Sequence, residues 1–475
     1  MPAPQFPATR RTFLCQSLAA LGWLAMPALR PAWAAIPIPN VTRLYTVSVA
    51  KVVVPLSVQE VCATLKAWPG QVAVGGGRYS MGGQIGIQDG LHLDMRSLNQ
   101  LVWIQPEQSK VRIQAGMRWR DLQEVLDPLG LAVQTMQSYS NFTIGGSVSV
   151  NAHGRYVGNG PVGHSVLALQ LVLADGSVRE ASPKQNADLF AAVIGGYGAL
   201  AVITEIELQL ARNSHIERAV RIVPLDAYVE HFQRDVLADE RSVLHNADLM
   251  PPRFDAPVSV TWRTSDQPLT VTERLVPRNR SYRLDRSVLL ALTEVPGALS
   301  LRRKVIHPLL NAGSKVQWRN REASLDVAEL EPENRAHSTY VLQEYFIPPK
   351  YFTNFARGMA AILRANRAKV LNVSVRHSPA DKVSLMAWAK QEVFSFVLFY
   401  KQGTSAEAQA EVGEWTRQLI DLALQHEGRY YLPYQLHASR QQFEQAYPEV
   451  IQLRGLKQKY DPAGKLSNSL WQKYL

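Results

Sequence analysis

A glycine-rich loop near the start of the chain sets the strongest constraint on its fold. The ten residues from Gly75 to Gln84 read GGGRYSMGGQ and directly follow the apolar run Val72–Val74. Five glycines in ten residues cost backbone entropy that a plain connector does not justify. Glycine lets another group approach the backbone and exposes N–H groups, which together can cradle a pyrophosphate. The alternative is a glycine-rich hairpin turn, and the loop alone does not separate the two.

Three further glycine segments follow along the chain. Thr143–Gly154 reads TIGGSVSVNAHG, Asp175-Gly176 is typical of a tight hairpin turn, and Gly195–Gly198 precedes the apolar stretch Ala199–Leu210. Small residues in such segments let a planar or anionic ligand lie against the backbone. No Gly-x-Gly-x-x-Gly motif opens a helix after a strand with an acidic residue about 20 positions later, which argues against a Rossmann domain.

Short β-like runs bounded by Gly, Pro, Asn or Asp fill the first part of the chain. They cover residues 52–55, 71–74, 91–95, 101–104, 110–115, 166–173 and 201–210. Two helices are expected between them. Ser57–Ala67 begins with a capping box of Ser57 and Glu60, and Trp119–Leu129 has apolar residues at helical spacing. This mixture predicts an α+β domain over residues 36–212.

The segments between residues 213 and 440 are longer and more charged. The predicted amphipathic helices and strands are Tyr351–Ala365, Ala406–His426, Ser259–Arg263 and Glu392–Tyr400. They indicate a second α+β domain with a mixed, mostly antiparallel sheet. Residues 441–475 are expected to be helical and to turn at Asp461-Pro462-Ala463-Gly464.

The first 35 residues have the parts of a secretory signal. Arg10 and Arg11 precede a short apolar stretch that ends at Ala32-Trp33-Ala34. Paired arginines followed by Phe-Leu resemble a twin-arginine signal, which exports folded proteins. The alternative is a membrane anchor, although the stretch is short for a bilayer. We therefore expect residues 1–35 to be removed and the mature chain to be periplasmic or otherwise exported, with membrane association not required.

Charge and cysteine content narrow the function classes. The formal net charge is +11, but the basic residues are scattered and form no nucleic-acid-binding motif, so nucleic acid is not an expected partner. The positive field would attract an anionic cofactor or substrate. With Cys15 in the predicted signal, Cys62 remains alone, which excludes an intramolecular disulfide and a thiolate metal site. No metal site is predicted.

The order and spacing of the glycine segments resemble the PCMH-type FAD-binding domain, typified by vanillyl-alcohol oxidase and p-cresol methylhydroxylase. The likeness covers residues 51–210 and is greatest to the sugar-lactone and alditol oxidase branch. It implies a two-subdomain FAD-binding domain over 36–212, a substrate domain over 213–440, and a segment 441–475 that returns to the FAD domain. The residues it implies for FAD contact are Gly75, Gly76, Gly77, Arg78, Tyr79, Ser80, Ser140, Thr143, Gly145, Gly146, Asn151, Val202 and Ile203.

One departure from the family lies in the first loop. Many members carry a histidine there that bonds covalently to the flavin ring, whereas this chain has Tyr79. We therefore predict non-covalent, dissociable FAD.

The substrate side departs further from the family. In the alditol-oxidising branch, a Glu-x-Arg pair and a strand histidine shape the pocket. Here Arg376 is kept, the acid position holds Ser374, and the histidine position falls near Val397. A base or acceptor is still needed for the hydroxyl proton. The predicted pocket residues are Arg376, Tyr431, Tyr434 and His437; Glu344, Tyr345 and His377 are further candidates, and His153 is expected beside the flavin.

The resemblance implies a D-arabinono-1,4-lactone oxidase-like enzyme that uses FAD to oxidise CH–OH groups. Hydride would pass from a sugar, aldonolactone or polyol-like substrate to the flavin, and then to oxygen, a quinone or a cytochrome. One alternative is oxidation of an amine or of a phenolic or cytokinin-like side chain. Another is a non-catalytic periplasmic protein that binds flavin or a ligand.

Overall fold

The computed structural model describes residues 35–278, 280, 313–327 and 334–475. Residues 36–475 form one unit, which is separate from residues 1–35. The predicted signal falls on residues 1–34, outside the described residues, so the signal and the export that it implies stay predictions.

A small parallel sheet begins the fold, with the strand order β3-β5-β4. Its strands are β3 (Lys51–Val53), β4 (Val72–Gly75) and β5 (Leu91–Asp94), and the hairpin β1 (Ile36–Pro39) with β2 (Thr46–Val49) precedes them. Helix α2 (Val58–Ala67) makes the parallel crossover. Ser57 caps it as predicted by accepting from the N–H of Glu60, but the Glu60 carboxylate reaches Leu56 N–H instead of Ser57 N–H. The glycine loop leaves directly from the end of β4.

An antiparallel sheet completes the first half of the chain, in the order β10-β9-β11-β7-β6 with β8 also paired to β11. Its strands are β6 (Leu101–Gln105), β7 (Lys110–Gln114), β8 (Leu131–Val133), β9 (Val166–Leu173), β10 (Val178–Ala181) and β11 (Ala201–Arg212). The helices are α3 (Trp119–Leu126), α4 (Ile144–Ser149) and α5 (Ala187–Val193). Asp175 and Gly176 join β9 to β10 in the predicted hairpin, with Gly176 at a φ of 77°.

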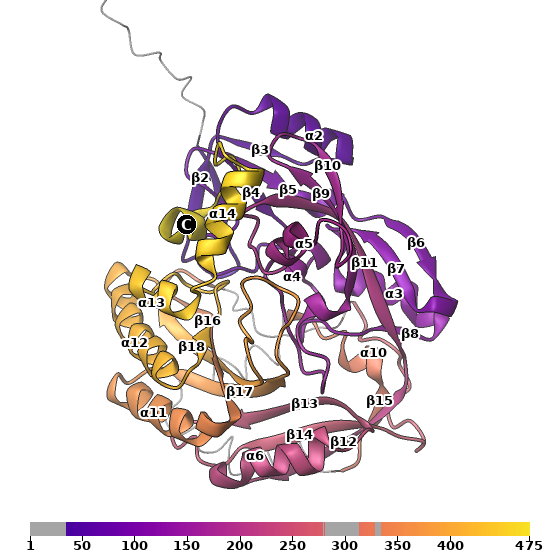
Figure 1. Cartoon of the computed structure of the whole chain (residues 1–475). Coiled ribbons are helices and arrows are strands. Elements are labelled where there is room, and N and C mark those ends of the chain that lie inside the picture. Colours follow the sequence, from indigo (N-terminus) through magenta and orange to yellow (C-terminus); the bar gives the residue numbers. More distant parts are fainter. Residues whose placement is uncertain (1–34, 279, 281–312, 328–333) are drawn as a thin grey trace, which may run out of the picture. The chain divides into compact units, whose positions relative to one another are not determined.

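A larger antiparallel sheet forms the second half, in the order β15-β12-β14-β13-β17-β18-β16-β19 (Figure 1). Its strands are β12 (His215–Ile222), β13 (Ser242–Leu249), β14 (Val258–Thr264), β15 (Val316–Trp318), β16 (Ser338–Ile347), β17 (Val370–Ser378), β18 (Val393–Gly403) and β19 (Arg429–Tyr430). Its helices are α6 (Tyr228–His231), α10 (Arg319–Glu322), α11 (Phe352–Ala365) and α12 (Ala406–Gln425). The α+β prediction with a mostly antiparallel second sheet is confirmed.

The last residues lie against the first sheet. After α13 (Arg440–Ala446) and α14 (Val450–Tyr460), Leu466 forms a parallel bridge with Val72 of β4. Val72 N–H donates to Lys465 C=O at 2.7 Å, and Ser467 N–H donates to Val72 C=O at 3.0 Å. Asn468, the N-cap of α15 (Ser469–Tyr474), donates to Tyr197 C=O at 2.8 Å. The chain end therefore touches both the root of the glycine loop and the Gly195–Gly198 turn.

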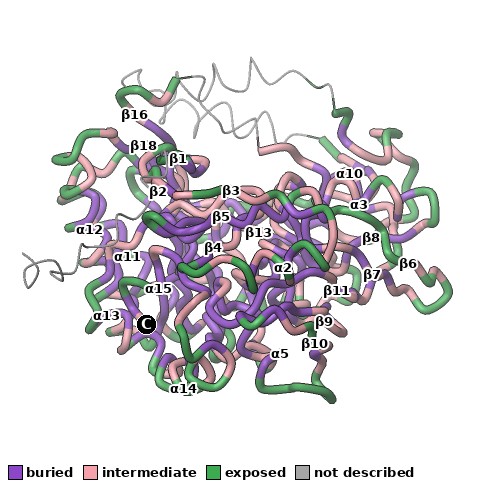
Figure 2. The backbone as a smooth tube through the Cα atoms, turned by 90° about the horizontal axis from the view of Figure 1, so that it is seen from above, coloured by how far each residue is buried: buried purple, intermediate pink, exposed green. Residues whose placement is uncertain are grey.

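Buried residues follow the strands and the inner helix faces, and exposed residues lie on outer loops and outer helix faces (Figure 2). No helix in the described part of the chain combines the length and apolar character needed to cross a membrane. Within the same residues, no group of three or more His, Cys, Asp or Glu side chains is arranged to hold a metal ion.

Candidate active site

One pocket collects most of the predicted cofactor residues. Its wall is built from the glycine loop, the residues around α4, the Tyr197–Gly198 turn, and the middle of strands β16, β17 and β18. The predicted FAD residues that line it are Gly75, Gly76, Gly77, Arg78, Tyr79, Ser80, Thr143, Gly145, Gly146 and Ile203. The pocket thus runs from the loop after β4 to the centre of the large sheet.

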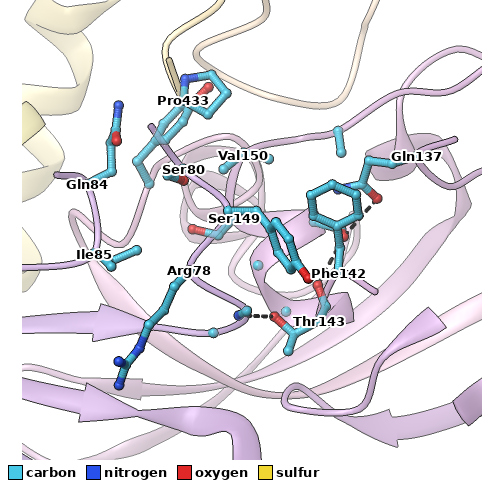
Figure 3. A pocket seen from close by; sticks show the side chains of 18 of the residues that line it. Arg78, Ser80, Gln84, Ile85, Gln137, Phe142, Thr143, Ser149, Val150 and Pro433 are labelled. Carbon is cyan, nitrogen blue, oxygen red and sulfur yellow. Dashed lines mark hydrogen bonds between the residues drawn. The ribbon is translucent and has the colours of Figure 1, made fainter. Parts of the chain in front are cut away.

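The glycine loop presents mainly backbone to this pocket. Gly77 N–H donates to Thr143 Oγ1 at 3.3 Å, which ties the loop to the start of α4 (Figure 3). Arg78 has a φ of 62°, and its guanidinium turns away to form an ion pair with Asp94 at 3.0 Å. A Cβ on Gly76 would lie 2.2 Å from Thr143 Oγ1. Glycine is therefore required where the loop approaches α4.

Helix α4 forms the facing wall through close packing on the end of β7. Gly145 N–H donates to Ala115 C=O at 2.8 Å. A Cβ on Gly145 would meet Ala115 Cβ at 2.6 Å and Ala115 O at 2.8 Å. Only glycine lets the helix sit this close, and the position of α4 sets that of Thr143 and Gly146 in the pocket wall.

At the other end of the pocket, a buried carboxylate meets a histidine. Glu344 Oε1 lies 2.5 Å from His153 Nε2, and Tyr434 OH donates to Glu344 Oε2 at 3.2 Å. Burial alone would raise the pKa of Glu344, but His153, Arg376 and Tyr434 hold this pKa below its usual value. Burial and the adjacent carboxylate raise the pKa of Tyr434 well above its usual value, so its hydroxyl stays protonated.

Arg376 from β17 faces the same end of the pocket. Its guanidinium is buried and its Nε has no hydrogen-bond partner among the described residues. Burial lowers its pKa, and the charge of Glu344 opposes that effect. A buried guanidinium without hydrogen bonds is costly unless a ligand completes it. Arg376 is thus suited to hold an oxygen atom of a bound molecule.

Two family models match the chain. The model described as "FAD binding domain" matches residues 49–182, and the model described as "D-arabinono-1,4-lactone oxidase" matches residues 259–474. The first model covers the glycine loop and α4, and the second covers Glu344, Arg376 and Tyr434. Both ends of the pocket therefore fall within the matched segments.

Individual proteins agree with the two models. The chain is 23% identical to L-gulonolactone oxidase of Bos taurus over 88% of this chain and 92% of that protein. It is 33% identical to the Mus musculus enzyme of the same name over 34% of this chain. The matched segment spans only 36% of the length of that relative. It is also 26% identical to cytokinin dehydrogenase 9 of Oryza sativa subsp. japonica over 69% of this chain and 66% of that protein.

The chain belongs to the FAD-dependent aldonolactone oxidase family. Enzymes of this family act on CH–OH donors, and FAD is the cofactor that the pocket must hold. The pocket fits it: the loop and α4 are lined by glycines whose side-chain positions are blocked by Thr143 and Ala115. A flat, anionic group can lie against such a backbone wall. Arg376, whose Nε has no hydrogen-bond partner among the described residues, lines the same pocket.

Four predicted residues lie outside this pocket, and three of them support its wall from behind. Ser140 donates to Leu325 C=O through its N–H and its hydroxyl, at 2.9 Å and 3.1 Å. Asn151 donates to Asp381 at 2.8 Å and accepts from Gly163 N–H at 2.9 Å. Val202 belongs to a buried core cluster, whereas Ile203 lines the pocket. The two differ because neighbouring residues of a strand point to opposite faces.

His437 is the fourth residue outside the pocket. Its ring lies beside Gly413, and burial together with Lys473 and Arg417 lowers its pKa to about 4. Two of the further candidates, Tyr345 and His377, also lie outside the pocket. Tyr345 is a fully buried core residue, and His377 pairs with Glu392 at 2.8 Å away from the pocket. Of the four predicted substrate residues, the structure brings Arg376, Tyr431 and Tyr434 together.

Sheet register explains how a carboxylate reaches the pocket although the family's acid position holds serine. Ser374 of β17 pairs with Val397 of β18, and Val397 pairs with Glu344 of β16. The three residues form one row across the sheet, so an acid on β16 faces the same region as an acid on β17 would. The sequence signal was a lone glutamate in an apolar strand, which cannot be assigned a face until the register is known.

Proposed function

We propose that this enzyme oxidises a CH–OH group of a sugar lactone or related polyol. The observation that carries the proposal is the buried, unfilled guanidinium of Arg376 beside Glu344, at the far end of a glycine-walled pocket. FAD, when bound, supplies the hydride acceptor and later passes the electrons to oxygen, a quinone or a cytochrome. The names of the Bos taurus and Mus musculus relatives support a lactone as the substrate.

The chain's own residues bind and orient the substrate. Arg376 holds a substrate oxygen through its charged N–H groups. Tyr431 donates its hydroxyl to Val150 C=O at 2.8 Å, so its ring is fixed as a wall of the pocket. Phe346 and Trp388 stack with ring centroids 4.2 Å apart behind this end, and both rings pack against that of Tyr431.

An anaerobic bleaching screen tests the proposed reaction. Purified yellow enzyme is mixed without oxygen with L-gulonolactone, D-arabinono-1,4-lactone, an alditol, a primary amine and a cytokinin. We expect a lactone or the alditol to bleach the flavin absorbance at about 450 nm, after which oxygen, a quinone and a cytochrome are each tested for restoring the colour. Bleaching by the cytokinin alone would select the reaction suggested by the Oryza sativa relative. A protein that binds FAD but is bleached by none of them would contradict the proposal.

We also propose that FAD is held without a covalent bond. Tyr79 stands at the position of the family's linking histidine, and its ring packs on Phe142 with centroids 4.5 Å apart. A phenol at this place lacks the imidazole nitrogen that attacks the flavin methyl group. We expect acid precipitation to leave all yellow colour in the supernatant and a white pellet. Flavin that stays with the washed pellet would contradict this expectation.

A further inference from the structure

We propose that Glu344 accepts the hydroxyl proton during the oxidation and that His153 positions its carboxylate. This inference rests on the proposed function, since it assigns a proton acceptor to that reaction. Glu344 lies in the same row of the sheet as Ser374, which stands at the family's acid position. The second group, His153, comes from the segment after α4.

Packing alone does not explain why a carboxylate, Glu344, is buried at this position. It lies in the middle of β16 with a side chain only 2% exposed, and it lines the pocket. A buried carboxylate is costly unless hydrogen bonds and charges compensate it. His153 and Tyr434 each contact one of its two oxygens, at 2.5 Å and 3.2 Å. The carboxylate is therefore kept at the pocket wall at a cost that His153, Tyr434 and the charge of Arg376 offset.

His153 is fixed from several sides. Its ring centroid lies 4.8 Å from Trp388, 5.7 Å from Phe346 and 6.0 Å from Tyr431. Trp388 is itself held by donating to Asn151 C=O at 2.8 Å. Beside His153, a Cβ on Gly154 would meet Met136 O at 2.0 Å, so the backbone there is fixed as well. The imidazole can hold Glu344 Oε1 in one orientation.

Charged and titratable groups face Glu344 from every element packed around it. They are His153 after α4, Tyr197 before β11, Arg376 on β17, Tyr431 and Tyr434 after β19, and Tyr447 between α13 and α14. Burial acts to raise the pKa of Glu344, and His153, Arg376 and Tyr434 more than offset it. Glu344 is thus ionised at neutral pH and can accept a proton without first losing one.

The step balances with the groups at hand. The substrate O–H bond breaks and its proton goes to Glu344, which becomes a neutral carboxylic acid. The C–H bond breaks with its electron pair, which leaves as hydride for the bound FAD, and the carbon and oxygen form a C=O bond. The substrate is oxidised by two electrons and the FAD is reduced by two. Arg376 stabilises the oxygen as negative charge develops on it.

The test compares Glu344→Gln with Glu392→Gln. The control removes an acid that also pairs with a histidine, His377, but lies outside the pocket. Under saturating lactone without oxygen, we expect Glu344→Gln to slow flavin bleaching about 10²- to 10⁴-fold, the usual contribution of general base catalysis. Glu392→Gln should stay within about threefold of wild type, the spread expected for a surface change. Glu344→Asp, which keeps a carboxylate, should recover part of the rate.

The pH profile distinguishes positioning from packing. The bleaching rate of wild type should fall as the pH drops through the depressed pKa of Glu344. Since His153 lowers that pKa, His153→Gln should move this limb to higher pH, and Glu344→Gln should remove it. A purely structural role for His153 would lower the rate without moving the limb.

A second measurement needs no turnover. Acid titration of the oxidised enzyme without substrate should produce the infrared band of a protonated carboxylic acid that Glu344→Gln lacks. The assignment of Glu344 is wrong if the wild type is bleached and Glu344→Gln is bleached equally fast. It is also wrong if that variant keeps both the infrared band and the low-pH limb. In both cases the proposed function stands. If no CH–OH substrate bleaches wild type, the proposed function fails and the assignment fails with it.

Discussion

Gly145→Val is expected to bind FAD more weakly than the wild type and to purify with less flavin. The new side chain would enter the space where Gly145 already lies against Ala115, with a Cβ only 2.6 Å from Ala115 Cβ. To relieve the clash, α4 must move away from β7 and carry Thr143 and Gly146 with it. Overpacking of this kind costs about 1–3 kcal/mol, which corresponds to about 5- to 150-fold in FAD affinity if the strain falls on the bound state.

The matched control is Gly455→Ala. Gly455 also lies in a helix, α14, but apart from that helix's own backbone no atom of the described residues lies within 4 Å of the position that an added Cβ would take there. Alanine favours a helix over glycine by about 1 kcal/mol, so this variant should bind FAD normally and unfold at the same or a higher temperature. The measurements are the ratio of flavin to protein absorbance and a titration of FAD into stripped protein. Normal FAD affinity in Gly145→Val would show that the close approach of α4 does not matter.

Arg376→Met should lower kcat/KM for the lactone about 10²- to 10³-fold, the loss typical when one charge-stabilising donor is removed. The stability of the substrate-free enzyme should change little, because the substitution removes the cost of a guanidinium without hydrogen bonds together with the charge that helps to offset the buried Glu344. Activity and stability therefore move independently. The measurements are steady-state kinetics and the Tm of the FAD-loaded enzyme without substrate.

Arg319→Met provides the contrast. Arg319 is a buried arginine that donates to Val133 C=O at 2.9 Å and to Gln134 C=O at 3.2 Å, outside the pocket. Its removal takes a hydrogen bond from each of two backbone carbonyls, of which Gln134 C=O keeps the one from Asn159 Nδ2, and should lower the Tm with little effect on the kinetics of folded enzyme. A large fall in Tm for Arg376→Met, with kcat/KM preserved, would mean that Arg376 serves the fold and not the substrate.

The features that sequence predicted well depend on neighbouring residues. The cap at Ser57 and the hairpin at Asp175-Gly176 are decided within a few residues, and both are present in the structure. The helix predicted over Trp119–Leu129 continues as predicted, although its last turn tightens to a 3-10 helix at Asp127–Leu129, where Pro128 lies. Hydrophobic periodicity and turn chemistry carry this information because they act locally.

The way in which the predicted site residues come together depends on pairing between parts of the chain that are far apart in sequence. Glu344 and Arg376 come from strands that are separated by β18 in the sheet, so only the register brings their side chains to one pocket. His437 follows the pocket residue Tyr434 by three positions, yet its ring turns toward α12. Ser140 and Asn151 were placed by resemblance to segments that do line the pocket, and their actual partners are Leu325 and Asp381. No local pattern contains these contacts.

The bridge between Val72 and Leu466 has a consequence for how the enzyme is made. The strand that leads into the glycine loop gains its outer neighbour only from residues 465–467, whose backbone bonds to Val72 on both sides. When the first 212 residues have left the ribosome, the glycine loop is therefore exposed. Residues 465–467, which bond to the strand before the loop, have not yet been synthesised. We therefore expect full FAD affinity only in a chain that includes residues 465–467.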